Sequence, residues 1–209
     1  MPLISVVTPC YNEQDNIREL HAQIKVVFSK LPGYAYEHIC IDNASSDGTV
    51  AILRELAGED KNLKVIVNAR NFGHIRSPQY ALLQARGDAV IGMASDLQDP
   101  PGLIPDFIKK WEEGYKIVLG VKTSSEESGA MFAVRKAYYE LIGRLSEIKL
   151  VKNATGFGLY DRAVIDVLRT IDDPYPYFRG LICDIGFAQA HIEYTQPQRR
   201  RGITEHAVG

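Results

Sequence analysis

The stretch LISVVTPCYNE, residues 3–13, carries the pattern on which the fold prediction depends. Residues 3–8 are apolar or β-branched and predict a buried strand, after which the chain turns polar. In the segment that follows, Ile17, Leu20 and Ile24 recur at helical spacing with charged residues between them. A strand followed by an amphipathic helix is the first half of a β–α–β unit.

The same pattern repeats through the first 121 residues. Further strands are predicted at 37–41, 63–67, 88–93 and 117–121, and helices at 50–56, 78–85 and 103–111. This alternation indicates an α/β fold with a doubly wound, mostly parallel sheet and helices on both faces. We expect the central sheet to be complete by residue 121, a polar loop at 123–129, a long amphipathic helix at 131–145 and a last strand at 188–194.

The composition bounds the kind of protein. With 45% hydrophobic and 24% charged residues, the 209 residues fit one globular domain over 1–209. The formal net charge of -2 gives no overall attraction to nucleic acid. Cys10, Cys40 and Cys183 have neither zinc-type spacing nor the density of a disulfide scaffold, and no stretch approaches about 18 consecutive apolar residues. We therefore expect a cytoplasmic protein with buried thiols.

Polar segments follow the first four predicted strands: TPCYNE (8–13), DNASSDGT (42–49), NARNFG (68–73) and SDLQD (95–99). In open α/β sheets, ligands bind beyond the carboxyl ends of the strands. Each segment by itself is also explained by helix caps and turns. Four of them at one crevice indicate a binding site.

The residue types at this crevice suit a nucleotide. The carboxylate of Asp42 can accept a hydrogen bond from a uracil or guanine ring, and Tyr11 can offer the base an aromatic surface. Neither a GxGxxG nor a GxxxxGK[ST] motif is present to bind phosphates. Asp96 and Gln98, two apart on a segment expected to be extended, could instead hold Mg²⁺ or Mn²⁺ at a diphosphate, although a solvated acidic turn is the alternative.

Taken together, these motifs resemble the family 2 glycosyltransferases. The similarity covers almost the whole chain, and it is carried by TPCYNE (8–13), DNASSDGT (42–49), ARNFGH (69–74), SDLQDPP (95–101), TGFGLYDR (155–162) and QRRRGIT (198–204). Within this family, the motifs resemble those of enzymes of the dolichyl-phosphate mannosyltransferase and bactoprenol glucosyltransferase type.

The resemblance implies a GT-A fold and an inverting transfer of a sugar from a UDP- or GDP-sugar, with residues 1–121 as the nucleotide-sugar-binding half and 122–209 as the acceptor-side half. It implies Mg²⁺ or Mn²⁺ at Asp96 and Gln98, with Asp96 and Arg200 as catalytic residues. The implied donor-binding residues are Pro9, Tyr11, Glu13, Asp42, Arg70 and Asp96, and the implied acceptor-phosphate residues are Arg199, Arg200 and Arg201.

Two residues depart from the family pattern. Ala94 stands where the first Asp of Asp-x-Asp-x-Gln is usual, and Gly156 stands where relatives often carry an acidic residue that activates an acceptor hydroxyl. Asp161 and Asp184 are possible replacements for this base. A phosphate monoester is already largely ionised at neutral pH and needs no base, whereas a sugar hydroxyl does.

We therefore expect polyprenyl phosphate as the acceptor, in cell-envelope biosynthesis at the inner face of the membrane. Two alternatives stay open. The first is transfer to a sugar hydroxyl of a polysaccharide or lipopolysaccharide, and the second is a degenerate module that binds nucleotide sugars without turnover.

Overall fold

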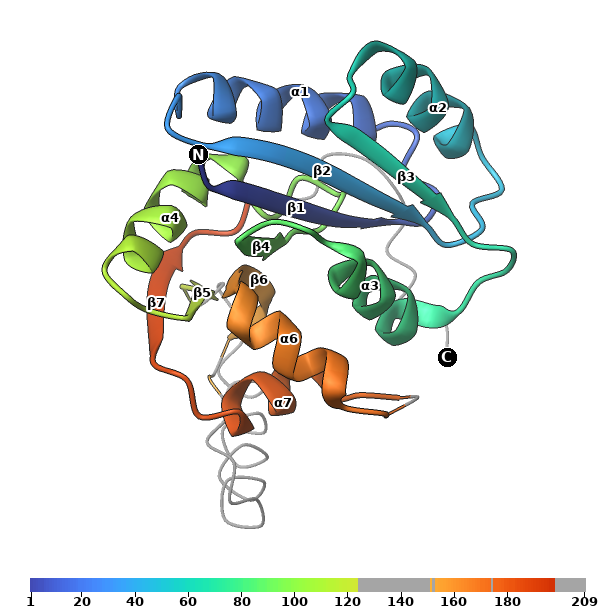
Figure 1. The fold of residues 1–209 in the computed structure, drawn as a ribbon. Helices are drawn as coiled ribbons and strands as arrows, with labels where there is room; N and C mark the ends of the chain where they lie inside the picture. Colours follow the sequence, from blue (N-terminus) through green and yellow to red (C-terminus); the bar gives the residue numbers. More distant parts are fainter. Residues whose placement is uncertain (124–150, 152, 174, 198–209) are drawn as a thin grey trace, which may run out of the picture.

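The computed structural model describes residues 1–123, 151, 153–173 and 175–197, which build a seven-stranded sheet with helices on both faces (Figure 1). The strand order is β3-β2-β1-β4-β6-β5-β7. β6 runs antiparallel to β4 and β5, and the other neighbouring strands pair in parallel. The bounds are β1 Leu3–Cys10, β2 Ala35–Asp42, β3 Leu63–Val67, β4 Ala89–Gly92, β5 Ile117–Lys122, β6 Ala154–Asp161 and β7 Gln189–Tyr194.

Helices cover both faces of this sheet. Successive side chains of β1 point to opposite faces, so this strand contributes to the core on each side. Ile4 and Val6 pack toward α1 (Ile17–Ser29), α2 (Thr49–Glu59) and α4 (Ile104–Glu112), the last preceded by the short 3₁₀ helix η1 (Pro101–Leu103). Val7 belongs to the core on the other side, with α3 (Gly73–Gln84), α6 (Arg162–Thr170) and α7 (Phe178–Asp184). Both apolar faces are thereby buried, as a mostly parallel sheet requires.

The sequence predictions for the first 121 residues are largely confirmed. The strand predicted at 63–67 matches β3 at both ends, and the other predicted strands and helices all form, most with ends shifted by a few residues. The last strand is confirmed as β7. The helix expected at 131–145 lies outside the described residues.

The expectation that the sheet is complete by residue 121 is wrong, because β6 inserts between β4 and β5. Its sequence, ATGFGLYD, contains two glycines that weaken a strand pattern. One of these glycines, Gly158, is required by the packing of β6 against β5. A Cβ at Gly158 would lie 2.4 Å from the carbonyl oxygen of Val118 on β5, so the close pairing of these strands needs glycine.

The antiparallel direction of β6 decides which of its ends reaches the binding edge of the sheet. Gly158 pairs with Gly92 at the carboxyl end of β4, and Asp161 pairs with Ala89 at its amino end. The first residues of β6 therefore lie beside the carboxyl ends of β1 and β4.

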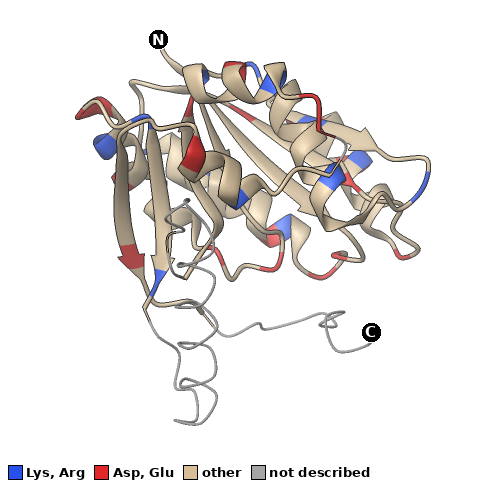
Figure 2. Ribbon diagram, turned by 90° about the horizontal axis from the view of Figure 1, so that it is seen from below, with Lys and Arg blue, Asp and Glu red and all other residues tan. Residues whose placement is uncertain are grey.

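As a group, the described helices carry side chains of both signs of charge. Acidic and basic side chains are interspersed along them (Figure 2), in agreement with the small net charge. Within the part of the chain that the structure describes, none of the helices has the length and apolar character needed to cross a membrane.

Candidate active site

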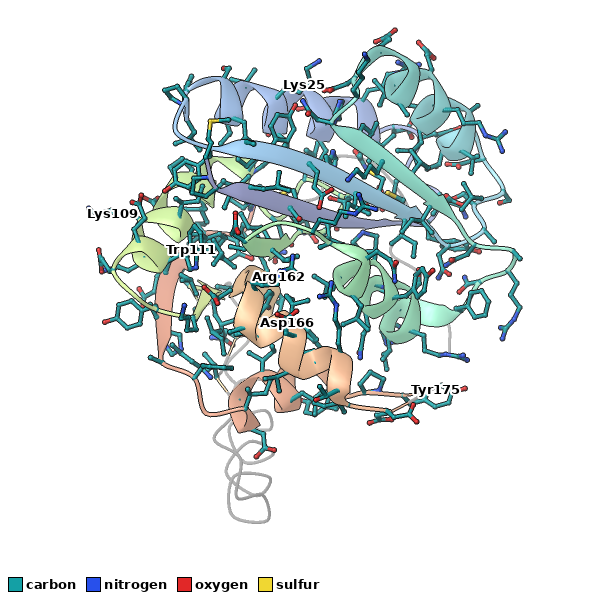
Figure 3. All side chains as sticks on the ribbon, in the orientation of Figure 1. Lys25, Lys109, Trp111, Arg162, Asp166 and Tyr175 are labelled. Atoms are coloured by element: carbon teal, nitrogen blue, oxygen red, sulfur yellow. The ribbon has the colours of Figure 1, made fainter. Side chains whose placement is uncertain are left out.

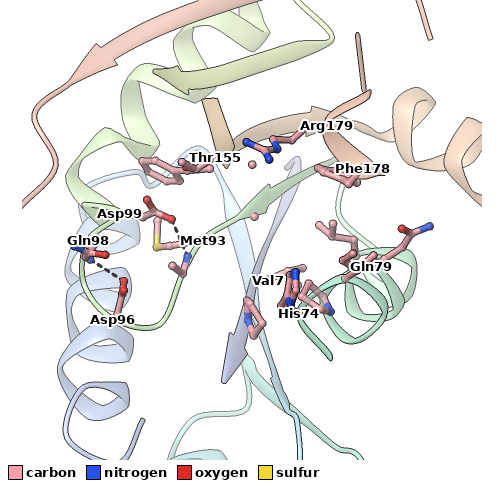
Figure 4. A pocket seen from close by; sticks show the side chains of 18 of the residues that line it. Val7, His74, Gln79, Met93, Asp96, Gln98, Asp99, Thr155, Phe178 and Arg179 are labelled. Atoms are coloured by element: carbon pink, nitrogen blue, oxygen red, sulfur yellow. Dashed lines mark hydrogen bonds between the residues drawn. The ribbon is translucent and has the colours of Figure 1, made fainter. Parts of the chain in front are cut away.

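A cavity of about 680 Å³ lies at the carboxyl ends of β1 and β4 (Figure 4). Its walls come from segments far apart in the sequence: the end of β1, one face of α3, the segment after β4, the end of β5, the start of β6 and the segment leading into α7. Polar side chains on these walls include His74, Gln79, Asp96, Gln98, Asp99, Lys122, Thr155, Arg179 and Gln196. The cavity occupies the position at which open α/β sheets bind ligands.

Asp96 and Gln98, predicted as metal ligands, both line the cavity. Their segment is a turn and not the extended stretch that we expected, because Leu97 has a φ of 63°. The Oδ1 atom of Asp96 accepts a hydrogen bond from the backbone N–H of Gln98 at 3.1 Å. This turn, and not strand alternation, brings the carboxylate and the amide to the same wall (Figure 4).

Asp99 braces the turn from within. It is 6% exposed, and its Oδ2 atom accepts a hydrogen bond from the backbone N–H of Ala94 at 2.9 Å. Its Oδ1 atom accepts another from the hydroxyl of Tyr194 on β7 at 3.0 Å. Burial raises the pKa of Asp99, and these two hydrogen bonds oppose the rise. The carboxyl group thus ties the turn to the far edge of the sheet.

Asp42, predicted to contact the nucleotide base, is fully buried at the end of β2. Its Oδ2 atom accepts a hydrogen bond from the backbone N–H of Ser45 at 3.0 Å. Its Oδ1 atom is buried and has no hydrogen-bond partner among the described residues. A buried carboxylate oxygen without a partner is costly, so this atom is suited to accept a hydrogen bond from a ligand.

The two loops beside Asp42 are locked together by hydrogen bonds. The backbone N–H of Asn12 donates to Ser45 Oγ at 2.9 Å, and Asn12 Oδ1 accepts from the backbone N–H of Ser46 at 2.9 Å. The backbone N–H of Gly48 donates to Gln14 Oε1 at 2.8 Å. These contacts hold the ends of β1 and β2 in one arrangement before any ligand binds.

The other predicted donor-binding residues are placed differently. Pro9 lines the cavity. Tyr11 is half-buried at the start of the loop after β1 and does not line the cavity. Glu13 is buried and accepts a hydrogen bond from Asn16 Nδ2 at 2.7 Å. Arg70 is exposed, with its guanidinium 4.2 Å from the centre of the Phe72 ring, and it does not line the cavity.

Asp161 and Asp184, the possible replacements for the base, do not line this cavity. Asp161 ends β6 at the opposite end of the strands from the cavity. There it accepts hydrogen bonds from Trp111 Nε1 of α4 (Figure 3) at 2.6 Å and from Lys116 Nζ at 3.0 Å. It also caps α6 through the backbone N–H of Ala163. Because β6 runs antiparallel, Asp161 lies at the amino end of β4 and away from this cavity.

Arg199, Arg200 and Arg201 lie outside the described residues. In the described part, the structure adds Asp99, Lys122, Thr155 and Arg179 to the site. Asp99 is part of the segment SDLQD (95–99), so the sequence did point to the region in which it lies. Arg179 had no such signal, since its place depends on how α7 folds back over β6.

Comparisons with known proteins identify the class. The sequence profile of glycosyl transferase family 2 matches residues 5–169. The chain therefore belongs to glycosyl transferase family 2, and its fold is of the GT-A type.

Two curated relatives illustrate the match. An uncharacterised glycosyltransferase of Synechocystis is 34% identical over 97% of this chain and 64% of its own length. The bactoprenol glucosyl transferase of Shigella phage SfV is 30% identical over 97% of this chain and 66% of its own length. The chain thus spans about two thirds of the length of these relatives.

Solved structures agree on the fold. A mannosyltransferase from Pyrobaculum calidifontis in complex with GDP-Man and Mn²⁺ superposes with a TM-score of 0.62 at 17% identity, covering 95% of this chain and 58% of that one.

Proposed function

We propose that this glycosyltransferase moves a sugar, with inversion, from a UDP- or GDP-sugar to a polyprenyl phosphate. Membership of the family supports transfer of a sugar. The name of the phage relative, a bactoprenol glucosyl transferase, supports a lipid phosphate as the acceptor. The acceptor's chain would hold the enzyme close to a membrane surface.

The donor half of the proposal is supported by Asp42. Its unpartnered Oδ1 atom lies at the end of β2, next to the paired loops and Tyr11. A ring N–H of uracil or guanine would satisfy this oxygen. Recognition of a base here would direct the diphosphate toward the carboxyl end of β4, where Asp96 is found.

Asp96 and Gln98 fit a divalent cation that keeps several water or phosphate ligands, because they offer one carboxylate and one amide oxygen on the same wall. The described residues contain no group of three or more His, Cys, Asp or Glu side chains arranged to hold a metal. Mg²⁺ or Mn²⁺ at Asp96 and Gln98 would supply charge stabilisation for the departing diphosphate. The structure of the mannosyltransferase with Mn²⁺ supports this choice of ion.

The observation that carries the acceptor half is the set of carboxylates in the cavity. Among the described residues that line it, the acidic side chains are Asp96 and Asp99. Asp96 is assigned to the proposed cation, and both oxygens of Asp99 already accept hydrogen bonds. Gly156 provides no side chain where relatives often carry a base. A phosphate dianion suits such a site because it needs no base to attack.

In the proposed step, an oxygen of the acceptor phosphate attacks C1 of the sugar from the side opposite the leaving group. The bond between C1 and the nucleoside diphosphate breaks, and its electron pair leaves with the diphosphate. The products are a sugar phosphodiester of the lipid and the free nucleoside diphosphate, and no proton is transferred. The residues of this chain contribute by holding both reactants in line.

A second candidate is transfer to a sugar hydroxyl, and one observation favours it. Burial raises the pKa of Asp99, and a carboxylate with a raised pKa is a better base than an ordinary one. In that reaction Asp99 would accept the hydroxyl proton.

The test is a transfer assay with UDP-glucose and GDP-mannose as donors, and with polyprenyl phosphate, the free polyprenol and an oligosaccharide as acceptors. We expect turnover with the phosphate, inversion at C1 by NMR, and a pH profile without a catalytic base. Transfer to the oligosaccharide that is lost in Asp99→Asn, with none to the phosphate, would replace this proposal by the second candidate.

A further inference from the structure

Arg179 is a basic side chain of the cavity for which the sequence motifs assigned no role. It lies at the start of α7 and lines the cavity together with Thr155 and Gly156 of β6. Figure 4 shows it reaching the cavity beside Thr155, away from Asp96 and Gln98. Its position is therefore separate from the proposed metal and diphosphate site.

Two local contacts position the guanidinium of Arg179. Its Nη1 atom donates a hydrogen bond to the carbonyl oxygen of Ala154 at 3.3 Å. Its Cζ atom lies 5.8 Å from the centre of the Tyr177 ring. That ring is itself packed over Gly180, where a Cβ would lie only 2.5 Å from Tyr177 Cδ1. The side chain is thus oriented without a carboxylate.

The described part of the chain gives Arg179 no acidic partner, since none of its ion pairs includes this residue. The other Lys or Arg that lines the cavity, Lys122, differs because its charge acts on the carboxyl group of Asp99. A fixed guanidinium with open N–H groups suits a phosphate, which it can bind through two parallel hydrogen bonds.

Gly156 adds the space that such an anion needs. Its φ is +97°, and a Cβ built on it would meet nothing within 4 Å. It stands two residues from Ala154, the hydrogen-bond partner of Arg179. A carboxylate at this position would compete with a ligand anion for the guanidinium, whereas glycine leaves both the space and the charge to the ligand.

We propose that Arg179 binds the phosphate of the acceptor in the space left by Gly156 and holds it across the cavity from Asp96. This inference rests on the proposed function and deepens it by assigning the acceptor's phosphate to a residue. The shared chemistry is a phosphate group, which either the acceptor or the donor diphosphate could present. The placement of Arg179 away from Asp96 and Gln98 favours the acceptor.

The first test compares Arg179→Gln and Arg179→Lys with wild type, using Arg54→Gln on α2 as the matched control, since Arg54 is exposed and does not line the cavity. We expect Arg179→Gln to raise the KM for polyprenyl phosphate about 10- to 100-fold, as for loss of a charge-assisted hydrogen bond. The KM for the donor should stay within about twofold, and Arg179→Lys should recover part of the loss. A raised KM for the donor, or unchanged KM values for both substrates, would overturn the proposal.

The second test uses Gly156→Asp and Gly156→Asn, which share shape and backbone strain and differ in charge. We expect Gly156→Asp to weaken the acceptor more than Gly156→Asn by about tenfold, and this difference to shrink in an Arg179→Gln background. Equal effects of both variants would contradict competition for the guanidinium.

A third experiment measures binding without turnover, so that failure of this inference can be told apart from failure of the proposed function. Calorimetry with a short-chain prenyl phosphate, without donor, should show binding that Arg179→Gln weakens about tenfold or more. If wild type binds this probe through Arg179 and yet transfers no sugar to it, the proposed function fails and the anion site stands. Binding that is equal in both proteins would remove the anion site whatever the turnover.

Discussion

The two sides of the cavity are stabilised in different ways. On the nucleotide side, the loops after β1 and β2 are joined by hydrogen bonds between side chains and backbone, as between Asn12 and Ser45. On the acceptor side, Arg179 is held by one carbonyl oxygen and one aromatic ring. The comparison contrasts two loops that protein hydrogen bonds hold in one arrangement with a wall whose charge and space are left for a ligand.

The largest expected effect is the loss of activity on removing Asp96, which lines the cavity between the two sides. Asp96→Ala should lower kcat/KM about 1,000-fold or more, because the proposed cation would lose its carboxylate ligand. Steady-state kinetics with Mn²⁺, together with donor titrations with and without EDTA, measure the loss. Asp106→Ala, on exposed α4 surface, is the control. Transfer by Asp96→Ala at more than a tenth of the wild-type rate would remove Asp96 from the site.

On the acceptor side, a substitution in the pairing of β6 with β5 should lower the stability of the protein. Gly158→Ala should destabilise the protein by about 3 kcal/mol, because its Cβ would lie 2.4 Å from Val118 O inside a close-packed strand pair. Gly102→Ala, where a Cβ meets nothing within 4 Å, should be close to neutral. Urea unfolding compares the two variants, and equal midpoints would show that β6 has more room than the structure gives it.

The nucleotide side should lose stability in acid. Burial, and then the neighbouring His38, lower the pKa of His21 to about 4, while Asp60, 3.3 Å from its Nε2 atom, opposes this. The unfolded state, with a pKa near 6.5, binds the proton first, so stability is complete above about pH 7 and falls as pH drops toward 4.

Between pH 7.5 and 4.5 this residue should account for about 2 to 3 kcal/mol of lost stability. Urea unfolding of wild type and His21→Gln across this range isolates the contribution, since other groups titrate in both proteins. Parallel pH profiles would show that His21 titrates normally.

The smallest expected effect sharpens the comparison within the nucleotide side. Asp42→Asn should weaken donor binding roughly 30-fold without lowering stability, because it neutralises a buried oxygen that has no protein partner. Asp47→Asn should do the reverse, since Asp47 accepts hydrogen bonds from the backbone N–H groups of Thr49 and Gln14. Calorimetry and thermal unfolding of both variants test this, and unchanged donor affinity in Asp42→Asn would exclude it from the base site.

The nucleotide side could be predicted from the sequence in some detail. Its strands alternate with helices in chain order, so the ends of β1, β2 and β4 were expected at one edge before the structure was known. Asp42 ends β2, and Asp96 and Gln98 stand in the turn that comes after β4 and line the cavity. The extended geometry expected around Leu97 was wrong. Leucine rarely adopts a positive φ, so its sequence gave no sign of the turn.

The acceptor side could not be predicted in the same way. The sequence identifies TGFGLYDR as a motif and not as a strand, and it offers Asp161 as a possible replacement for the base missing at Gly156. The antiparallel pairing of β6 places Asp161 and Gly156 at opposite ends of the sheet. Arg179 reaches the cavity only because α7 packs against β6, as the contact between the Tyr160 and Phe178 rings shows.

The sequence by itself determined the α/β class, the order of the early strands and the residues at their carboxyl ends, because hydrophobic periodicity and turn residues act over short stretches of chain. Tertiary structure decided the direction and place of β6, the turn that presents Asp96, the bracing of Asp99 by Tyr194 and the position of Arg179. These depend on close approach of segments distant in the sequence, such as Gly158 against Val118, which no local pattern records.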